Sequence, residues 1–421
     1  MSTAASNAMA NAPVEIGSIA VPPEFGEALV DLGLASSPSL TGRPLTGGVS
    51  SDIWCIVADD GPLCAKRALA KLRVAADWRA PIERNRFEAR WMQVANEAVP
   101  GSAPAVLGQH PRLGVLAMSY LPAAKHTLWK QALHEGRADP MVARAVGTVL
   151  ARIHSHSAAR PQLAAEFATD AIFFDIRLEP YLLATARRHP DVAPRLEALV
   201  QTTQRNALAL VHGDVSPKNI LIGPNGPVLL DAECAWWGDP AFDIAFCLNH
   251  LLLKCVWVPP ATSGFLASFD ALAQAYLEGV DWEPRDAIER RAAALLPGLL
   301  LARVDGKSPV EYLETEAQRA PVRHVARALL QRPVESLADV AAAWKQELDR
   351  LTNARSGRSM AVGSGTAAGA RPSRRKSCLP TVRSASRSRR RARPAAPVKR
   401  SSCAMRPRRS AASMCGPRSI M

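Results

Sequence analysis

Two carboxylates and one amide stand at fixed offsets in a glycine-punctuated part of the sequence. Asp214 follows His212 and Gly213 in a sharp loop, and Asn219 comes five residues after Asp214. The second carboxylate, Asp231, ends an apolar, strand-like stretch twelve residues after Asn219. One carboxylate of such a set can accept a hydroxyl proton, while an amide oxygen and the other carboxylate suit Mg²⁺, which prefers hard oxygen ligands. The spacing therefore indicates phosphoryl transfer.

The motifs around these residues resemble those of a known superfamily. Residues 212–219 read H-G-D-x-x-x-x-N, residues 229–233 read L-L-D-x-E, and residues 238–243 read G-D-P-x-x-D. This pattern is similar to that of the aminoglycoside phosphotransferase / choline kinase-like superfamily, which shares the protein-kinase fold, and the resemblance covers roughly residues 45–351. The chain has His-Gly-Asp and Asp-Ala-Glu where protein kinases have His-Arg-Asp and Asp-Phe-Gly. The resemblance therefore implies a small-molecule hydroxyl as acceptor.

The resemblance also implies a role for each motif residue. Asp214 would be the catalytic base, and Asn219 and Asp231 would be the magnesium ligands. Asp243 would hold the catalytic loop by accepting backbone N–H groups. Glu233 is left open between an approach to a second metal position and a solvated side chain. A turn-capping Asp214 is the plain alternative, but it does not explain the agreement at the other positions.

A hairpin is expected near the start of the folded part. Residues 53–57 are an apolar, β-rich run, and residues 62–67 follow after the turn Asp59-Asp60-Gly61. A Gly-Gly turn with two hydroxyls precedes the first strand and matches the place of a phosphate-covering loop: Gly47, Gly48, Ser50 and Ser51. Such a loop binds phosphate through backbone N–H groups and hydroxyls. A Gly-Gly turn is also common in ordinary hairpins.

Lys66 ends the second strand and is the expected phosphate-binding lysine. Strand alternation places Lys66 on the same face as Cys64. The lysine needs a carboxylate partner from the following helix, where Glu83 and Glu88 both lie. We favour Glu88, because it shares a helix face with apolar residues and matches the Arg-x-x-x-Glu pattern that begins at Arg84. The alternatives are an exposed strand lysine and a solvated helix acid.

The adenine ring is expected at the connection that follows a third strand. Residues 115–118 are apolar and strand-like, and the stretch continues to Leu121. Met118 and Tyr120 lie in this stretch, whose backbone N–H and C=O groups would contact the adenine edge. An ordinary interdomain connector predicts the same location.

These patterns predict an α+β, bilobal protein-kinase-like fold. We expect a small N-lobe with an antiparallel sheet that binds the nucleotide, residues 22–122, and a larger, mainly helical C-lobe with the catalytic loop and the substrate site, residues 123–352. Residues 1–21 lack helical or strand periodicity and are expected to be disordered. Residues 353–421 are rich in Arg and Ser, with no aromatic residue, and are expected to be a disordered basic tail.

The net charge of +14 comes from that tail. Residues 353–421 hold 18 Lys or Arg and no Asp or Glu, so residues 1–352 hold 52 − 18 = 34 basic and 38 acidic residues, a net charge of −4. We therefore expect no specific nucleic-acid binding by the folded body, although the Arg-rich segment 387–393 leaves nucleic-acid contact by the tail open. No window approaches the roughly 20 apolar residues of a membrane helix, and no signal peptide is evident.

The predicted function is transfer of the γ-phosphoryl group of Mg·ATP to a hydroxyl of a small molecule, in the cytoplasm, with Mg²⁺ as cofactor and ATP as co-substrate. The five cysteines of residues 1–352, out of eight in the whole chain, include no C-x-x-C pair, which fits a reducing compartment. A catalytically silent, kinase-like nucleotide-binding module is the alternative. The acceptor is open between an aminoglycoside, a choline-like amine, a methylthioribose-like sugar and another hydroxyl compound. Four acids of the helical part suit a cationic acceptor or are simply solvated: Asp281, Glu283, Asp305 and Glu311.

Overall fold

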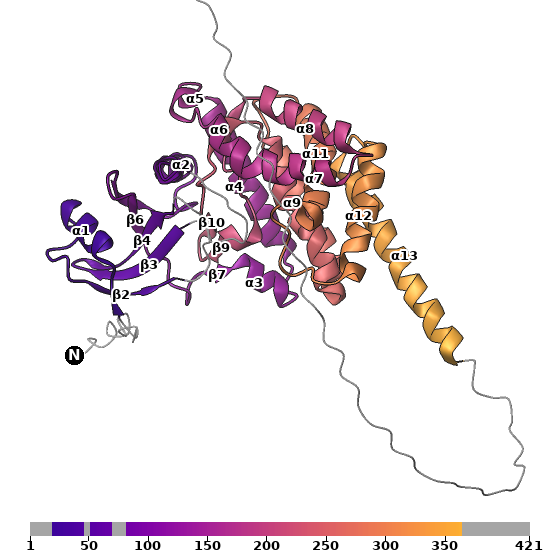
Figure 1. Cartoon of the computed structure of the whole chain (residues 1–421), viewed down its shortest axis with the longest axis horizontal. Coiled ribbons are helices and arrows are strands. Elements are labelled where there is room, and N and C mark those ends of the chain that lie inside the picture. Colours follow the sequence, from indigo (N-terminus) through magenta and orange to yellow (C-terminus); the bar gives the residue numbers. More distant parts are fainter. Residues whose placement is uncertain (1–18, 46–50, 70–80, 364–421) are drawn as a thin grey trace, which may run out of the picture. The chain divides into compact units, whose positions relative to one another are not determined.

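The computed structural model describes residues 19–45, 51–69 and 81–363 (Figure 1). The chain divides into two compact units, Met1–Gly363 and Ser364–Met421, and every described residue belongs to the first unit. The predicted basic tail therefore lies almost entirely outside the described residues. Gly47, Gly48 and Ser50 of the predicted phosphate loop lie outside them as well.

The N-terminal part is built around a six-stranded antiparallel sheet with the strand order β1-β2-β3-β4-β6-β5. Its strands are β1 (Ile19–Ala20), β2 (Thr41–Pro44), β3 (Ser51–Ala58), β4 (Gly61–Ala68), β5 (Val106–His110) and β6 (Val115–Ser119). The predicted hairpin is confirmed, since β3 and β4 pair from Ser51 and Ala68 to Ala58 and Gly61. Gly61 has a φ of +112°, a conformation that glycine adopts without strain.

Two helices, α1 (Pro23–Asp31) and α2 (Arg84–Ala98), pack on opposite faces of this sheet. Side chains alternate between the faces along β6: Val115 and Ala117 pack with α1, whereas Leu116 and Met118 belong to the main core with α2. The same alternation on β4 places Ala65 in the α1 cluster, so that Lys66 faces the α2 side.

The remainder is mainly helical, as predicted. Its helices are α3 (Trp129–His134), α4 (Pro140–Ala158), α5 (Leu163–Glu166), α6 (Asp170–Phe173), α7 (Ala184–Arg188), α8 (Ala193–Arg205), α9 (Ala241–Trp257), α10 (Thr262–Glu278), α11 (Arg285–Asp305), α12 (Glu316–Gln331) and α13 (Leu337–Gly363). Two short antiparallel sheets, β10-β9-β7 and β11-β8, carry the motifs. Their strands are β7 (Thr127–Leu128), β8 (Ala209–Val211), β9 (Ile220–Gly223), β10 (Gly226–Leu229) and β11 (Trp236–Gly238).

Helix α9 lies at the centre of the helical part. Its residues from Ala241 to Cys255 are all buried, which is typical of a helix surrounded by other helices. Helix α4 packs closely on α10 because Gly147 has no side chain: a Cβ there would lie 2.4 Å from the backbone oxygen of Leu272. Helices α10 and α11 pack against α9, and α4 packs against α10, so that the four helices share one continuous core.

One segment between α6 and α7, Phe174–Leu183 (η1), is π-helical and contains Pro180. A proline inside a helix removes one backbone donor and disturbs the hydrogen-bond ladder, and π-helical turns are frequent at functional sites. The predicted lobe boundary near residues 122–123 lies in the connection between β6 and β7, and the predicted tail boundary at residue 352 lies within α13.

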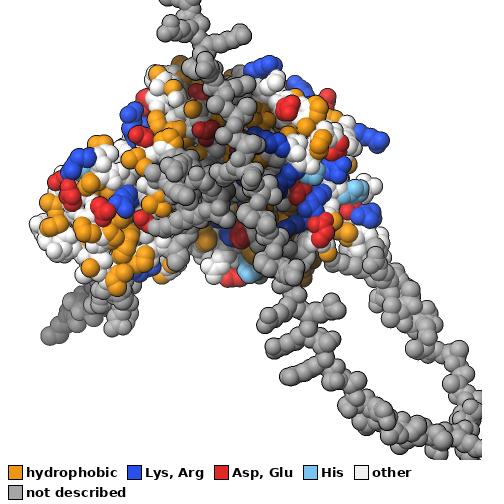
Figure 2. Space-filling model, in the orientation of Figure 1, with side chains coloured by type: hydrophobic (Ala, Val, Ile, Leu, Met, Phe, Trp, Pro, Cys, Tyr) orange, Lys and Arg blue, Asp and Glu red, His pale blue; other side chains and the backbone are white. Residues whose placement is uncertain are grey.

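On the described surface, charged side chains of both signs are interspersed (Figure 2). Many form ion pairs, such as Arg90 with Glu166 and Arg327 with Asp191. None of the helices in the described ranges is both long enough and apolar enough to cross a bilayer.

Candidate active site

The loop that bears Asp214 and Asn219 connects β8 to β9, and a side chain from α9 holds it in place. Asp243, in the first turn of α9, is fully buried and accepts the backbone N–H groups of His212 at 2.7 Å and Gly213 at 2.8 Å. Gly213 has a φ of +80°, and a Cβ there would lie 2.8 Å from the backbone oxygen of Cys234. The sharp loop that the sequence predicted therefore requires glycine at this position.

His212 is a packed loop residue rather than an acid–base group. Its Nδ1 accepts the backbone N–H of Asp214 at 3.1 Å, so the proton is on Nε2, which lies 3.1 Å from the backbone oxygen of Leu230. The ring also packs edge-on against Trp91. Burial lowers the pKa of His212 below its usual value, which keeps the ring neutral.

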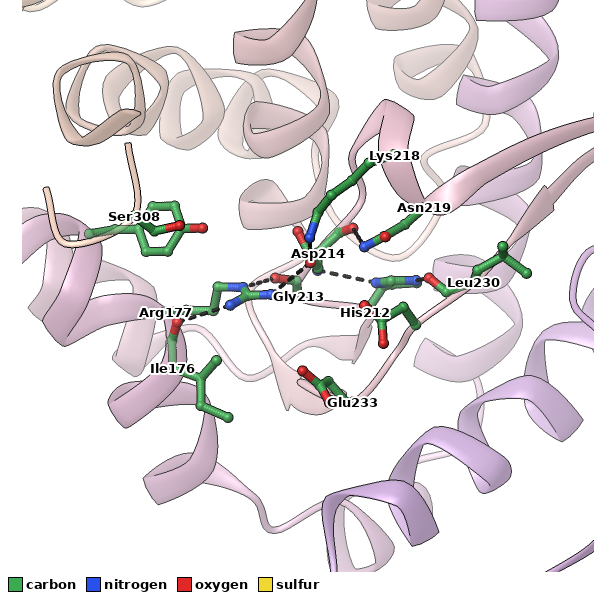
Figure 3. Close-up of polar contacts among 12 residues, drawn as sticks. Ile176, Arg177, His212, Gly213, Asp214, Lys218, Asn219, Leu230, Glu233 and Ser308 are labelled. Atoms are coloured by element: carbon green, nitrogen blue, oxygen red, sulfur yellow. Dashed lines mark hydrogen bonds and ion pairs between the residues drawn. The ribbon is translucent and has the colours of Figure 1, made fainter. Parts of the chain in front are cut away.

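Asp214 lies between two cations (Figure 3). Its Oδ2 is 3.0 Å from Nη2 of Arg177 and 3.2 Å from Nζ of Lys218. Burial alone would raise the pKa of Asp214, but the positive charges of Lys218 and Arg177 lower it below the usual value. The carboxylate is therefore ionised and able to accept a proton.

Neither cation received a role from the sequence. Lys218 lies within the H-G-D-x-x-x-x-N motif, one residue before Asn219, at a position that the motif leaves unspecified. Arg177 lies on the π-helical segment, where it also donates to the backbone oxygen of Gly213 at 2.5 Å. No sequence signal marks Arg177, because only the packing of η1 against the catalytic loop brings it to Asp214.

Asn219 and Asp231, the two predicted magnesium ligands, each carry a side-chain oxygen that can bind a metal ion. Asn219 Nδ2 donates to the backbone oxygen of Asp214 at 3.1 Å, which leaves its Oδ1 available. Asp231 has a φ of +66° and is the only described residue other than glycine with a positive φ. Such a conformation costs energy for a residue with a side chain and is frequent at functional sites.

These two residues fit a magnesium ion. An amide oxygen and a carboxylate are the hard ligands that Mg²⁺ prefers, and the remaining positions of its octahedron go to water and phosphate oxygens. Within the described part of the chain no three His, Cys, Asp or Glu side chains form a metal site. This matches an ion held by few protein ligands rather than by a cage.

Lys66 joins the sheet to the motifs of the helical part. Its Nζ lies 2.8 Å from the carboxylate of Glu88 on α2 and forms an ion pair with Asp231. Of the two helix acids left open by the sequence, Glu88 reaches the lysine, whereas Glu83 is exposed. Burial lowers the pKa of Lys66, but the carboxylates of Asp231 and Glu88 outweigh burial and raise it, so the amine stays charged.

A second buried ion pair fixes the same helix. Arg84 lies one turn before Glu88 on α2. Its Nε is 2.9 Å from Oε2 of Glu233. Glu233 is therefore buried rather than solvated, and it forms an ion pair with α2. Arg84 also donates to the backbone oxygens of Leu69 and Pro81.

The other predicted nucleotide residues lie at the edge of this site. Ser51 begins β3, and its buried hydroxyl has no partner among the described residues. Met118 is paired with both neighbouring strands of β6, and Tyr120 and Leu121 directly follow the end of this strand. The Tyr120 hydroxyl accepts a hydrogen bond of 2.7 Å from Arg43.

Comparison with known proteins identifies the family. Residues 41–254, about half of the chain, match the family model described as the phosphotransferase enzyme family. The chain is similar to methylthioribose kinase from Cronobacter sakazakii, at 26% identity over 226 residues that cover 47% of this chain and 55% of that protein. It is also similar to methylthioribose kinase 1 from Oryza sativa subsp. japonica, at 23% identity over 249 residues that cover 52% and 57%. The chain thus spans little more than half the length of these relatives.

A solved structure of a choline/ethanolamine kinase family protein from Mesorhizobium loti aligns with 77% of this chain and 99% of its own, at 18% identity and a TM-score of 0.44. The family match itself includes Lys66, Asp214, Asn219 and Asp231. The chain belongs to the phosphotransferase enzyme family.

Proposed function

We propose that the chain is an ATP-dependent phosphotransferase that transfers the γ-phosphoryl group of Mg·ATP to a hydroxyl of a small molecule. The observation that carries this proposal is the ion pair of Lys66 with both Glu88 and Asp231, next to the loop that bears Asp214 and Asn219. Residues from the sheet, α2 and the catalytic loop thus meet in the arrangement that phosphoryl transfer needs.

In the proposed reaction Lys66 donates hydrogen bonds to phosphate oxygens of ATP, and Glu88 holds the lysine in place. Asn219 and Asp231 would hold the magnesium ion, which supplies positive charge against the phosphate oxygens. The ion pair between Lys66 and Asp231 supports the assignment of both residues to the phosphate end of the nucleotide.

Asp214 accepts the proton of the acceptor hydroxyl. A bond forms between the acceptor oxygen and the γ-phosphorus, while the bond from this phosphorus to the β–γ bridging oxygen breaks and ADP leaves. Arg177 and Lys218 keep Asp214 ionised before the reaction. Their positive charges also face the region in which negative charge develops on the transferred group.

We assign adenine contacts to the backbone from Met118 to Tyr120, where the chain leaves β6 toward the helical part. Gly47, Gly48, Ser50 and Ser51 remain the proposed phosphate-covering loop, and the unpartnered Ser51 hydroxyl supports this role. We also place the protein in the cytoplasm, because its five described cysteines are free thiols and ATP is supplied there.

The experiment that tests this function measures ADP release by the purified full chain with Mg·ATP and a panel of amines, sugars, aminoglycosides and hydroxy acids. We expect ADP release that depends on one acceptor class, with a phosphorylated product of the expected mass. Failure to bind Mg·ATP would refute the proposal. Nucleotide binding with no ADP release for any acceptor class would favour a kinase-like module that only binds nucleotide.

A further inference from the structure

Three of the four helical-lobe acids that would suit a cationic acceptor are already in ion pairs. The pairs are Asp305 with Arg323, Glu283 with Arg291, and Glu311 with Lys130. The fourth acid, Asp281, is exposed and accepts a hydrogen bond from the Ser155 hydroxyl. Three of these carboxylates therefore offer no free negative charge for an amine.

Two buried basic side chains in the same lobe lack a carboxylate within ion-pair distance among the described residues. The first, Lys254 on α9, is 1% exposed. Its Nζ lies between two aromatic rings, 4.1 Å from the ring centre of Trp257 and 3.6 Å from that of Tyr312. Burial and the positive charges of Lys130 and Arg303 outweigh the carboxylate of Glu311 and lower the pKa of Lys254 to about 6, so the amine is mostly neutral at pH 7.5.

Arg303 on α11 is the second basic side chain of this kind, with 7% of its surface exposed. It donates only to neutral oxygens, the Tyr181 hydroxyl at 3.2 Å and the backbone and side-chain oxygens of Ser308. Its Nε has no partner within the described chain. A guanidinium buried without a counterion is costly, because buried charges are normally paired.

Two further buried polar atoms lie unpartnered between these cations. His250 is 5% exposed and Tyr312 is 8% exposed, yet neither Nε2 of His250 nor the Tyr312 hydroxyl has a partner among the described residues. Burial and the electrostatic effects of Arg303, Lys254, Lys218 and Lys130 lower the pKa of His250. The ring is therefore neutral, and its Nε2 makes no hydrogen bond with a described residue.

An aromatic layer connects this group to the reacting carboxylate. Arg177, which pairs with Asp214, lies 5.7 Å from the ring centre of Tyr181 and 5.9 Å from that of Phe246. The Phe246 ring in turn packs against His250 with 5.4 Å between ring centres. Two side-chain layers, Arg177 and Phe246, thus separate His250 from Asp214.

We propose that His250, Lys254, Arg303 and Tyr312 form an anion subsite for the acceptor, so that the acceptor is a hydroxyl compound that carries a carboxylate or a phosphate group. This inference rests on the proposed phosphotransferase function. The anionic group of the acceptor supplies the counterion that Arg303 lacks and brings a proton onto Lys254, and its hydroxyl is directed toward Asp214. Arg177 and Lys218 add further positive charge along the path.

The test uses the full chain and titrates two probes, inorganic phosphate and acetate, by isothermal calorimetry. The protein is first saturated with Mg·AMP-PNP, so that the phosphate groups of the nucleotide site are occupied. We expect saturable binding of at least one probe, and the stronger probe distinguishes a phosphate-bearing from a carboxylate-bearing acceptor. K254M should weaken this binding about tenfold or more, because a buried charge partner is lost.

K345M is the matched control, since Lys345 pairs with Asp349 on the exposed side of α13 and should bind the probes like wild type. If neither probe saturates, or if K254M binds both as tightly as wild type, the subsite is refuted. The result is independent of the function test: failure of AMP-PNP binding refutes the kinase proposal, whereas AMP-PNP binding without probe binding refutes only the subsite.

A wild-type measurement guards against a K254M chain that fails to fold. The acetate titration is repeated at pH 7.5 in two buffers with different ionisation enthalpies. Lys254 faces Lys130, Arg303 and Glu311, and a bound anion stabilises its protonated form, so binding should take up close to one proton. Binding without proton uptake would contradict the role of Lys254.

Discussion

At the scale of single residues, Asp214 is a buried carboxylate kept ionised by two cations rather than by exposure to water. Its pKa is below the usual value because Lys218 and Arg177 outweigh burial. Neither cation belongs to the Lys66–Glu88–Asp231 network. Proton acceptance and nucleotide binding are thus assigned to different side chains. Substitution of one side chain at a time can therefore separate the two roles.

Asp214→Asn should lower turnover by about 10²–10⁴-fold, the range for loss of general-base assistance. Asn has no charge and cannot accept the hydroxyl proton. Steady-state ADP release measures the effect, and Asp286→Asn is the matched control because Asp286 is exposed and pairs only with Arg290. Full turnover in Asp214→Asn would show that proton acceptance lies elsewhere.

Lys254 should make the stability of the fold depend on pH. Its pKa is about 6 in the folded protein, against 10.5 for an ordinary lysine. Between these two values the unfolded chain binds a proton that the folded chain does not, so the free energy of unfolding should rise with pH in this window, by at most about 1.4 kcal/mol per pH unit. Urea unfolding from pH 6.5 to 9.5 measures the slope.

Lys254→Met should flatten that slope and raise the free energy of unfolding at pH 7, because the variant lacks an amine that is mostly neutral in the folded chain and binds a proton on unfolding. Lys345→Met should leave both unchanged. An unaltered slope in Lys254→Met would mean that Lys254 is protonated throughout this range.

The motif residues could be placed from the sequence because their offsets are short and fixed. Asp214, Asn219 and Asp231 lie on one loop–strand segment, so local geometry alone brings them together. Arg177 and Arg303 could not be found in this way. They reach the site from η1 and α11, and their positions depend on how these helices pack.

At the scale of elements, α2 is held by two buried ion pairs one turn apart. Glu88 pairs with Lys66 on the sheet side, and Arg84 pairs with Glu233 just after Asp231. The helix is therefore fixed at once to the lysine and to the segment that bears the proposed magnesium ligand. Moving α2 would disturb both.

Arg84→Met should lower the free energy of unfolding by about 3–5 kcal/mol, since it leaves Glu233 buried without a partner. It should also raise the KM for ATP more than it changes kcat, because Lys66 loses part of its support. The double variant Arg84→Met, Glu233→Gln should recover a share of the stability. Additive losses in the double variant would contradict a direct coupling.

Arg90→Met is the matched control for this helix. Arg90 lies on α2 but pairs with Glu166 and Glu97 at the surface. Surface ion pairs contribute about 0–1 kcal/mol, so its removal should have little effect on stability or on the KM.

The longer elements followed from the sequence and several short ones did not. The hairpin of β3 and β4 was predicted because its turn chemistry and β-rich runs are local signals. The pairing of β8 with β11 joins residues more than twenty positions apart, and each strand has only three residues. The π-helical form of η1 also has no local signature beyond Pro180.

At the scale of the whole molecule, the sheet and the helical part each supply half of the proposed nucleotide site. Lys66 and Glu88 come from the N-terminal part, while Asp231 follows β10. The bilobal class was predictable from the change of pattern near residue 122. The proposed acceptor site was not predictable, because the side chains assigned to it come mainly from α9, α11 and η1 and share no motif.

A ligand that bridges both parts should stabilise them together. At a concentration 100 times its Kd, Mg·ATP should add about 2.7 kcal/mol to the free energy of unfolding. Thermal unfolding of the full chain with increasing Mg·ATP measures this gain. Asp231→Asn should show little or none of it, since the proposed magnesium ligand and the partner of Lys66 are lost together.

The central claim is that Asp231 acts in nucleotide binding while Asp214 acts in proton transfer. Isothermal calorimetry with Mg·ATP on wild type, Asp214→Asn and Asp231→Asn tests it most directly. We predict saturable binding to wild type, nearly the same affinity in Asp214→Asn, and a large loss in Asp231→Asn. Absence of binding to wild type, or an equal loss in both variants, would contradict the account.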